Sequence, residues 1–309
     1  MKDSFLDLDI LASGYPALRL FSEYPTDFVY ETLLKIRKWE LKNRFPERLT
    51  PYQKQAQEIF TPRRLEILND DFVVDQWIEY MSIERQIDMA LVLLKIKDRD
   101  FIDNCIEIKS DEPPDEIFGH SNILVTPHLG AYQAIPQLLC HFDYRLTALM
   151  CANAVPMWIN LMPYFSSDSK YKLLGLPSLS APRTAIKELR DGSNLLLYPE
   201  FSLTSSHKSE TTIQFLNETI YEIVGPARFA QITERPIVPI YIMRHHNFHY
   251  TLYVGQRLFV GPSARDVFHA TNIITKWLEN LIKQNPSQWW GWTIFENEMV
   301  VRQTSDCGE

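Results

Sequence analysis

Apolar residues recur at helical spacing in the first part of the chain. Residues 27–43, 51–60 and 72–96 each place their apolar side chains close to one helical face, with charged residues between them. Prolines punctuate these segments, at Pro46, Pro51 and Pro62. The pattern predicts a helical N-terminal region, which we place at residues 1–110. An acidic, proline-containing stretch at 110–116 (SDEPPDE) is expected to form the loop that follows it.

After residue 120, short apolar runs alternate with helical segments. The runs expected to be strands are 123–125, 146–150, 194–198, 237–243, 250–254 and 258–260. The segments expected to be helices are 131–141, 154–165, 182–190, 222–233 and 266–283. Such alternation is typical of βαβ units. We therefore expect an α/β fold with a mixed, mainly parallel central sheet flanked by helices, a core at 111–300 and a flexible tail at 301–309.

The first expected strand of the core runs into the segment TPHLGAYQ (residues 126–133). Ligands of parallel sheets bind at the carboxyl ends of the strands, and histidine is the side chain best suited to proton transfer near neutral pH. His128 is therefore a candidate catalytic residue, although a histidine there can also only cap the next helix. Gly130 permits close approach of a ligand or backbone. Tyr132 can face the cleft or the core, and Gln133 can hydrogen-bond the imidazole.

A second candidate segment is YPEFS (residues 198–202), which follows another buried strand. Because the carboxyl ends of parallel strands meet at one edge of the sheet, Glu200 is expected at the same edge as His128. A carboxylate at this position is alternatively a helix or turn cap.

These two segments together resemble the lysophospholipid acyltransferase superfamily, closest to the subgroup of lipid A late acyltransferases. Further stretches resemble that family in order and spacing, namely residues 148–160, 186–200, 222–244 and 285–297. The resemblance extends over about residues 50–297. It implies transfer of an acyl group from a thioester, on acyl carrier protein or coenzyme A, to a hydroxyl or amine. It also implies that His128 acts as general base, that backbone N–H groups near Gly130 stabilise the oxyanion, and that no cofactor or metal is required.

The chain departs from the family pattern at two positions. Gln133 stands where the family has an acid that orients the histidine, so Glu200 is the candidate substitute. Cys151 stands in a block where lipid A acyltransferases usually carry an arginine, which argues against a phosphorylated lipid acceptor. Together with the missing N-terminal membrane helix, these departures favour a soluble acceptor, within lipid or natural-product biosynthesis.

The resemblance and the charge pattern give a full set of expected site residues. The catalytic residues are His128, Gln133 and Glu200. Residues expected to bind substrate are Gly130, Tyr132, Cys151, Asn153, Ser202 and Arg228. An acidic carrier protein needs a basic surface, and the densest basic region comprises Lys170, Lys172, Arg183, Lys187 and Arg190. The alternative for this region is an ordinary solvated helix face. Three C-terminal tryptophans are expected to line an acyl tunnel or, as we favour, to seal the core. They are Trp289, Trp290 and Trp292.

Composition narrows the remaining possibilities. A net charge of −8 argues against a nucleic-acid binder, and the four cysteines lack zinc-site spacing. The sequence shows no apolar stretch of transmembrane length and no basic start of a signal peptide, so we expect a cytoplasmic protein that can still touch a membrane surface. Two other functions stay open: a non-catalytic subunit that binds acyl groups or carrier protein, and a thioester hydrolase.

Overall fold

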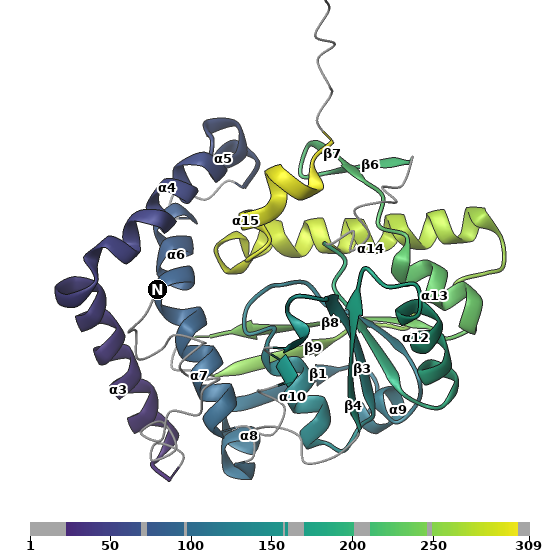
Figure 1. Ribbon diagram of the computed structural model, residues 1–309, viewed down its shortest axis with the longest axis horizontal. Coiled ribbons are helices and arrows are strands. Elements are labelled where there is room, and N and C mark those ends of the chain that lie inside the picture. Colours follow the sequence, from purple (N-terminus) through teal and green to yellow (C-terminus); the bar gives the residue numbers. More distant parts are fainter. Residues whose placement is uncertain are drawn as a thin grey trace, which may run out of the picture.

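The computed structural model describes residues 23–68, 73–95, 98–156, 158–159, 170–200, 211–245 and 249–301. The strands are β1 (Ile106–Ser110), β2 (Ile123–Val125), β3 (Leu146–Cys151), β4 (Tyr171–Leu176), β5 (Asn194–Leu197), β6 (Thr212–Phe215), β7 (Glu218–Tyr221), β8 (Ile237–Arg244) and β9 (Tyr250–Val254). Within the described residues, seven of them form one sheet in the order β1-β9-β8-β2-β5-β3-β4, and β6 and β7 form a separate hairpin (Figure 1). Neighbouring strands of the large sheet are parallel except β8 and β9.

The helices of the N-terminal region lie along one side of the molecule in Figure 1. They are α3 (Thr26–Trp39), α4 (Leu49–Ile59), α5 (Pro62–Leu68), α6 (Val73–Glu79), α7 (Arg85–Lys95) and α8 (Arg99–Cys105), with a π-helical turn, η3 (Tyr80–Glu84), joining α6 to α7. Apolar residues of α3, α7 and α8 share one core cluster with residues of the central strands. The helical region and the sheet are therefore packed through a common hydrophobic core.

Ion pairs also connect η3 and α7 to the sheet. Arg244, at the end of β8, donates to Asp88 at 3.1 Å and to Glu84 at 2.9 Å. Tyr250 donates to the same carboxylate oxygen of Asp88 at 2.8 Å. Although burial lowers it, the pKa of Arg244 is raised on balance by the Asp88 and Glu84 carboxylates. Arg244 is thus neutralised within the protein rather than offered to a ligand.

Alternate residues of the central strands pack against different helices. In β2, Leu124 joins the core cluster shared with α7 and α10 (Ala134–His141), whereas Ile123 and Val125 join the cluster of the opposite face. That opposite face is covered by α12 (Ala181–Arg190), α13 (Gly225–Thr233) and α14 (Ala264–Gln284). Both faces of the sheet are buried, which explains the uninterrupted apolar runs of its strands. The expected fold, a mixed and mainly parallel sheet flanked by helices with a helical N-terminal region, is confirmed.

Several individual elements differ from their predictions. Residues 106–110, which we placed in the helical region, form the edge strand β1. The strands β4, β6 and β7 were not predicted, and the last residues of the expected loop, 114–116, begin a short helix, α9 (Pro114–Phe118). Residues 258–260 were predicted as a strand but make only one bridge, between Leu258 and Ile237. The predicted helix at 154–165 and the tail at 301–309 lie mostly outside the described residues.

Candidate active site

His128 follows β2 at the carboxyl end of the strand. The turn that carries it requires a glycine at position 130. Gly130 has a φ of +58°, and a Cβ built on it would lie 2.1 Å from the carbonyl oxygen of Ile242. The turn is held on both sides, because the Gly130 N–H donates to the Gln288 carbonyl at 3.0 Å and the Tyr80 hydroxyl donates to the Gly130 carbonyl at 2.7 Å. The backbone that carries His128 is thereby fixed.

Glu200 holds His128 through two separate hydrogen bonds. The backbone N–H of His128 donates to Oε1 at 2.6 Å, and ring atom Nδ1 lies 3.2 Å from Oε2. Indole Nε1 of Trp289 also donates to Oε1, at 3.0 Å. The Glu200 side chain is fully buried, whereas that of His128 keeps 13% of its surface exposed. Buried carboxylates need such donors, and here they come from the histidine and from one tryptophan.

This geometry determines which ring nitrogen of His128 can act as a base. A carboxylate accepts hydrogen bonds, so the proton of a neutral imidazole is held on Nδ1 and the lone pair is left on Nε2. The same carboxylate stabilises the imidazolium that forms when Nε2 takes a proton. The ring is further positioned by Tyr198, Tyr132 and Trp290, whose ring centroids lie 4.1, 4.7 and 5.2 Å from its own. Burial raises the pKa of Tyr198, so its phenol stays protonated.

A cavity of about 270 Å³ opens beside His128. Its apolar wall is formed by Met89, Pro136, Ala148, Leu149, Met150, Ala154 and Trp158. Its polar and aromatic lining includes Arg85, Tyr132, Gln133, Cys151, Tyr171, Tyr198 and Trp290. A liquid water molecule occupies about 30 Å³, so the space is enough for about nine groups of that size. The space bounded by the described residues therefore holds a small organic molecule.

Gln133 does not hold the imidazole, contrary to the prediction. Its side chain is buried, and neither amide atom has a hydrogen-bond partner among the described residues. The position that faces Nδ1 of His128 is already occupied by Glu200, the acid that the sequence offered as the substitute. Gln133 is among the residues that line the cavity, and both of its amide atoms are buried. A buried amide without a partner is costly.

The predicted oxyanion site near Gly130 is also altered by the structure. The N–H of Gly130 is used by Gln288 and the N–H of His128 by Glu200. Neither of these two N–H groups is free to stabilise a developing negative charge.

The remaining residues predicted to bind substrate fall into three groups. Tyr132 and Cys151 line the cavity. Asn153 is exposed and is not among the residues that line it, and Arg228 is exposed on α13 and donates to Gln231 at 3.0 Å. Ser202 lies outside the described residues. Of the C-terminal tryptophans, Trp290 lines the cavity, while Trp289 and Trp292 belong to the core.

The residues of the predicted basic surface are divided between the two ends of the strands. Lys170 and Lys172 lie at the start of β4 and pair with Asp143 and Glu188. The helix α12 runs from the end of β4 back to the start of β5, so its last turn, with Lys187 and Arg190, lies away from the His128 edge. Only Arg183, in the first turn of α12, lies toward that edge.

Two residues of the site were not found from the sequence, Arg85 and Trp289. Trp289 was expected to line an acyl tunnel or to seal the core, and its N–H donation to Glu200 depends on a contact between segments far apart in the chain. Arg85 lies on a helix whose spacing shows amphipathicity and nothing about the cavity that the side chain reaches.

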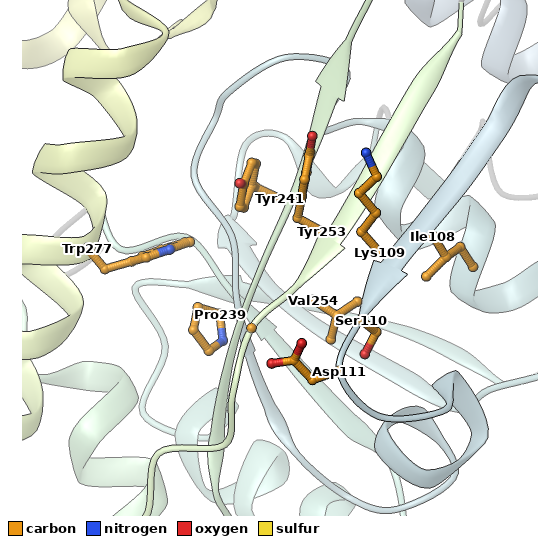
Figure 2. A pocket seen from close by; sticks show the side chains of 10 residues that line it. Ile108, Lys109, Ser110, Asp111, Pro239, Tyr241, Tyr253, Val254 and Trp277 are labelled. Atoms are coloured by element: carbon orange, nitrogen blue, oxygen red, sulfur yellow. The ribbon is translucent and has the colours of Figure 1, made fainter.

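A second hollow, of about 540 Å³, lies elsewhere on the sheet. Figure 2 shows Tyr241 and Tyr253 next to each other on its wall, and their rings are stacked at 4.6 Å. The hollow includes Ser110 and Val254, the last residues of β1 and β9, which run opposite to β2. It therefore lies toward the other edge of the sheet and is separate from the His128 site.

The sequence profile of bacterial lipid A biosynthesis acyltransferases matches residues 119–293, more than half of the chain. The chain belongs to this family and is an acyltransferase, as the resemblance implied. Among solved structures, it is similar to the 1-acyl-sn-glycerophosphate (LPA) acyltransferase PlsC from Thermotoga maritima. That likeness has a TM-score of 0.36 at 15% identity, and covers 76% of this chain and 97% of the other. No curated protein matches the chain. Within the described residues, no helix is both long and apolar enough to cross a membrane.

Proposed function

We propose that this acyltransferase moves an acyl group from a thioester, on acyl carrier protein or coenzyme A, to a hydroxyl or amine of a small soluble acceptor. The observation that carries the proposal is the hydrogen-bonded pair of Glu200 and His128, of which His128 lines the cavity. An imidazole with its Nδ1 proton on a carboxylate is a competent general base through Nε2. The cavity size supports a small acceptor.

The reaction balances with these groups alone. The acceptor O–H or N–H gives its proton to Nε2 of His128 as the oxygen or nitrogen attacks the thioester carbonyl carbon. The tetrahedral oxyanion then collapses, the carbon–sulfur bond breaks, and the leaving thiolate takes the proton from the imidazolium. The products are the acylated acceptor and a free thiol, and His128 returns to its neutral form. Glu200 keeps the ring in one tautomer and stabilises its positive charge.

Gln133 supplies the oxyanion donor in this proposal. Its buried amide has no partner among the described residues and lines the same cavity as His128. A preorganised N–H in a site of low polarity stabilises a developing oxyanion more strongly than it would in water. We expect Gln133→Glu to lower the transfer rate, although it restores the acid of the family motif, because a carboxylate repels the oxyanion. A rise in rate would instead assign position 133 to orienting the imidazole.

Mass spectrometry of the products tests the proposal as a whole. Wild-type protein and His128→Ala are incubated with acyl carrier proteins and acyl-coenzyme A of several chain lengths, with and without a panel of small amines and alcohols. We expect an acylated acceptor from the wild type and almost none from His128→Ala, while circular dichroism shows both proteins folded. Free fatty acid formed equally with and without acceptors would assign hydrolysis instead. Equal transfer by His128→Ala would refute the general base.

A further inference from the structure

Among the described residues that line the cavity, Arg85 is the one lysine or arginine, and it forms no ion pair with a described acid. Arg85 begins α7, its side chain lines the cavity, and its one side-chain hydrogen bond among the described residues is a 3.2 Å donation to the Tyr132 hydroxyl. Its Nε is buried and unbonded. Among the other described arginines that are at least half-buried, Arg37 pairs with Glu40, Arg64 with Glu296, Arg244 with Asp88 and Arg257 with Glu112. Arg48 has no ion pair among the described residues, but it lies over the Phe45 ring and does not line the cavity.

An arginine withdrawn from water without a counter-charge is costly, because desolvation is not offset by an ion pair. Its five N–H donors form a planar fork that matches the two oxygens of a carboxylate. In the structure, one of these donors is bonded to the Tyr132 hydroxyl, and the buried Nε has no hydrogen-bond partner among the described residues. We infer that Arg85 binds an acidic group of the acyl acceptor, and that this group is a carboxylate. The inference rests on the proposed function, because it assigns the cavity to the acceptor.

The charge and size of the cavity select a carboxylate over a phosphate. Arg85 is the only lysine or arginine among the described residues that line it. One positive charge balances a carboxylate, whereas a phosphate monoester of charge about −2 would remain partly uncompensated in a largely apolar space. The remaining wall is mostly apolar, with Met89, Leu149 and Trp158 among its residues.

These features identify the acceptor class as amino or hydroxy acids with an apolar side chain. The cavity volume of about 270 Å³ corresponds to about nine water-sized groups, which is the size of such an acid. With the carboxylate on Arg85, the α-amine or α-hydroxyl is the group presented to His128. The cation thus comes from the N-terminal helical region, not from the strand end where Cys151 replaces the family arginine.

Binding without an acyl donor tests the inference separately from catalysis. Isothermal titration calorimetry measures wild-type protein against the twenty amino acids, the corresponding α-hydroxy acids and the carboxamide of each. Charge-assisted hydrogen bonds lead us to expect that at least one apolar acid binds about 10- to 100-fold more tightly than its amide. Arg85→Gln should abolish this preference, Arg85→Lys should keep part of it, and Arg265→Gln, an exposed control, should keep all of it.

The outcomes separate the inference from the proposed function. Equal affinity for every acid and its amide, or the same preference in folded Arg85→Gln, overturns the carboxylate site. Tighter, Arg85-dependent binding of O-phosphoethanolamine than of any carboxylic acid also overturns it, in favour of a phosphate. Arg85-dependent acid binding without acyl transfer from any thioester would reject the proposed reaction and keep the site. Equal acyl transfer to acids and to their amides would keep the proposed reaction and reject the carboxylate site.

Discussion

Replacing Glu200 by glutamine changes one atom and is expected to place the His128 proton on the wrong nitrogen. In the structure, Oε1 accepts two N–H groups, from the His128 backbone and from Trp289, while Oε2 faces Nδ1 of the ring. A glutamine has one carbonyl oxygen for these three contacts. If that oxygen takes the place of Oε1, the amide NH₂ faces Nδ1, which must then accept a hydrogen bond and carry no proton. The proton of a neutral ring moves to Nε2, which can no longer act as a base.

The alternative amide orientation gives the size of the effect. Turning the carbonyl oxygen toward Nδ1 restores the productive tautomer but leaves two buried N–H donors facing an NH₂ group. Each unsatisfied buried donor costs about 1–3 kcal/mol, or about 2–6 kcal/mol together. The productive form is then populated at about one part in 30 to one part in 10⁴. Since the charge that stabilises the imidazolium is also lost, we expect the rate to fall by about 10³- to 10⁴-fold, comparable to removing the acid of a serine-protease triad.

Single-turnover transfer from a radiolabelled acyl-thioester measures this loss directly. Glu200→Gln should melt near the wild-type temperature, because the three contacts of the wild-type carboxylate can all be kept in the unproductive orientation. Glu279→Gln is the matched control, since Glu279 is also buried but lies on α14 and pairs with lysines there. Its rate should be unchanged. A folded Glu200→Gln protein that keeps the wild-type rate would show that the carboxylate has no part in catalysis.

Three further perturbations test the site and its support. Gly130→Ala should destabilise the fold by at least about 2 kcal/mol in urea unfolding, because φ is +58° and the new Cβ meets a carbonyl oxygen; wild-type stability would contradict this turn. Asp88→Ala should cost about 3–5 kcal/mol in the same assay by depriving buried Arg244 of a partner, and a loss below 1 kcal/mol would mean that the pair adds little. Cys151 is exposed at the cavity, whereas burial raises the pKa of Cys140 to about 12. N-ethylmaleimide at pH 7.5 should therefore modify Cys151 before Cys140 and block transfer. Cys151→Ser should resist inactivation, and inactivation of that variant at the wild-type rate would place the sensitive thiol elsewhere.

Much of the architecture could be predicted because the local patterns are strong. The helix predicted at 266–283 is observed as Ala264–Gln284, where a reciprocal capping box of Ser263 and Asp266 fixes its start. Central strands such as β2 and β5 are short apolar runs buried on both faces, so their composition alone revealed them. Edge strands did not have this signature. In β1 and β4 several side chains are only partly buried, and the polar residues among them obscured the pattern.

Only the site residues that directly follow strand ends could be predicted from the sequence. His128 and Glu200 follow parallel strands that pair directly, so their proximity follows from the topology of β2 and β5. The family motif has an acid where this chain has Gln133, and the substitute offered by the sequence, Glu200, is the residue that faces the ring. Arg85 was missed because no local pattern records which cavity a helical side chain enters. Such contacts depend on tertiary packing.

The protonation of the His128 ring offers the most direct test of the proposed catalysis. In protein labelled with ¹⁵N-histidine, the His128 nitrogens can be assigned from the signals that disappear in His128→Ala. For the neutral ring we predict a protonated, pyrrole-type Nδ1 and an unprotonated, pyridine-type Nε2. A proton on Nε2 instead would leave no lone pair facing the acceptor and would contradict His128 as the general base.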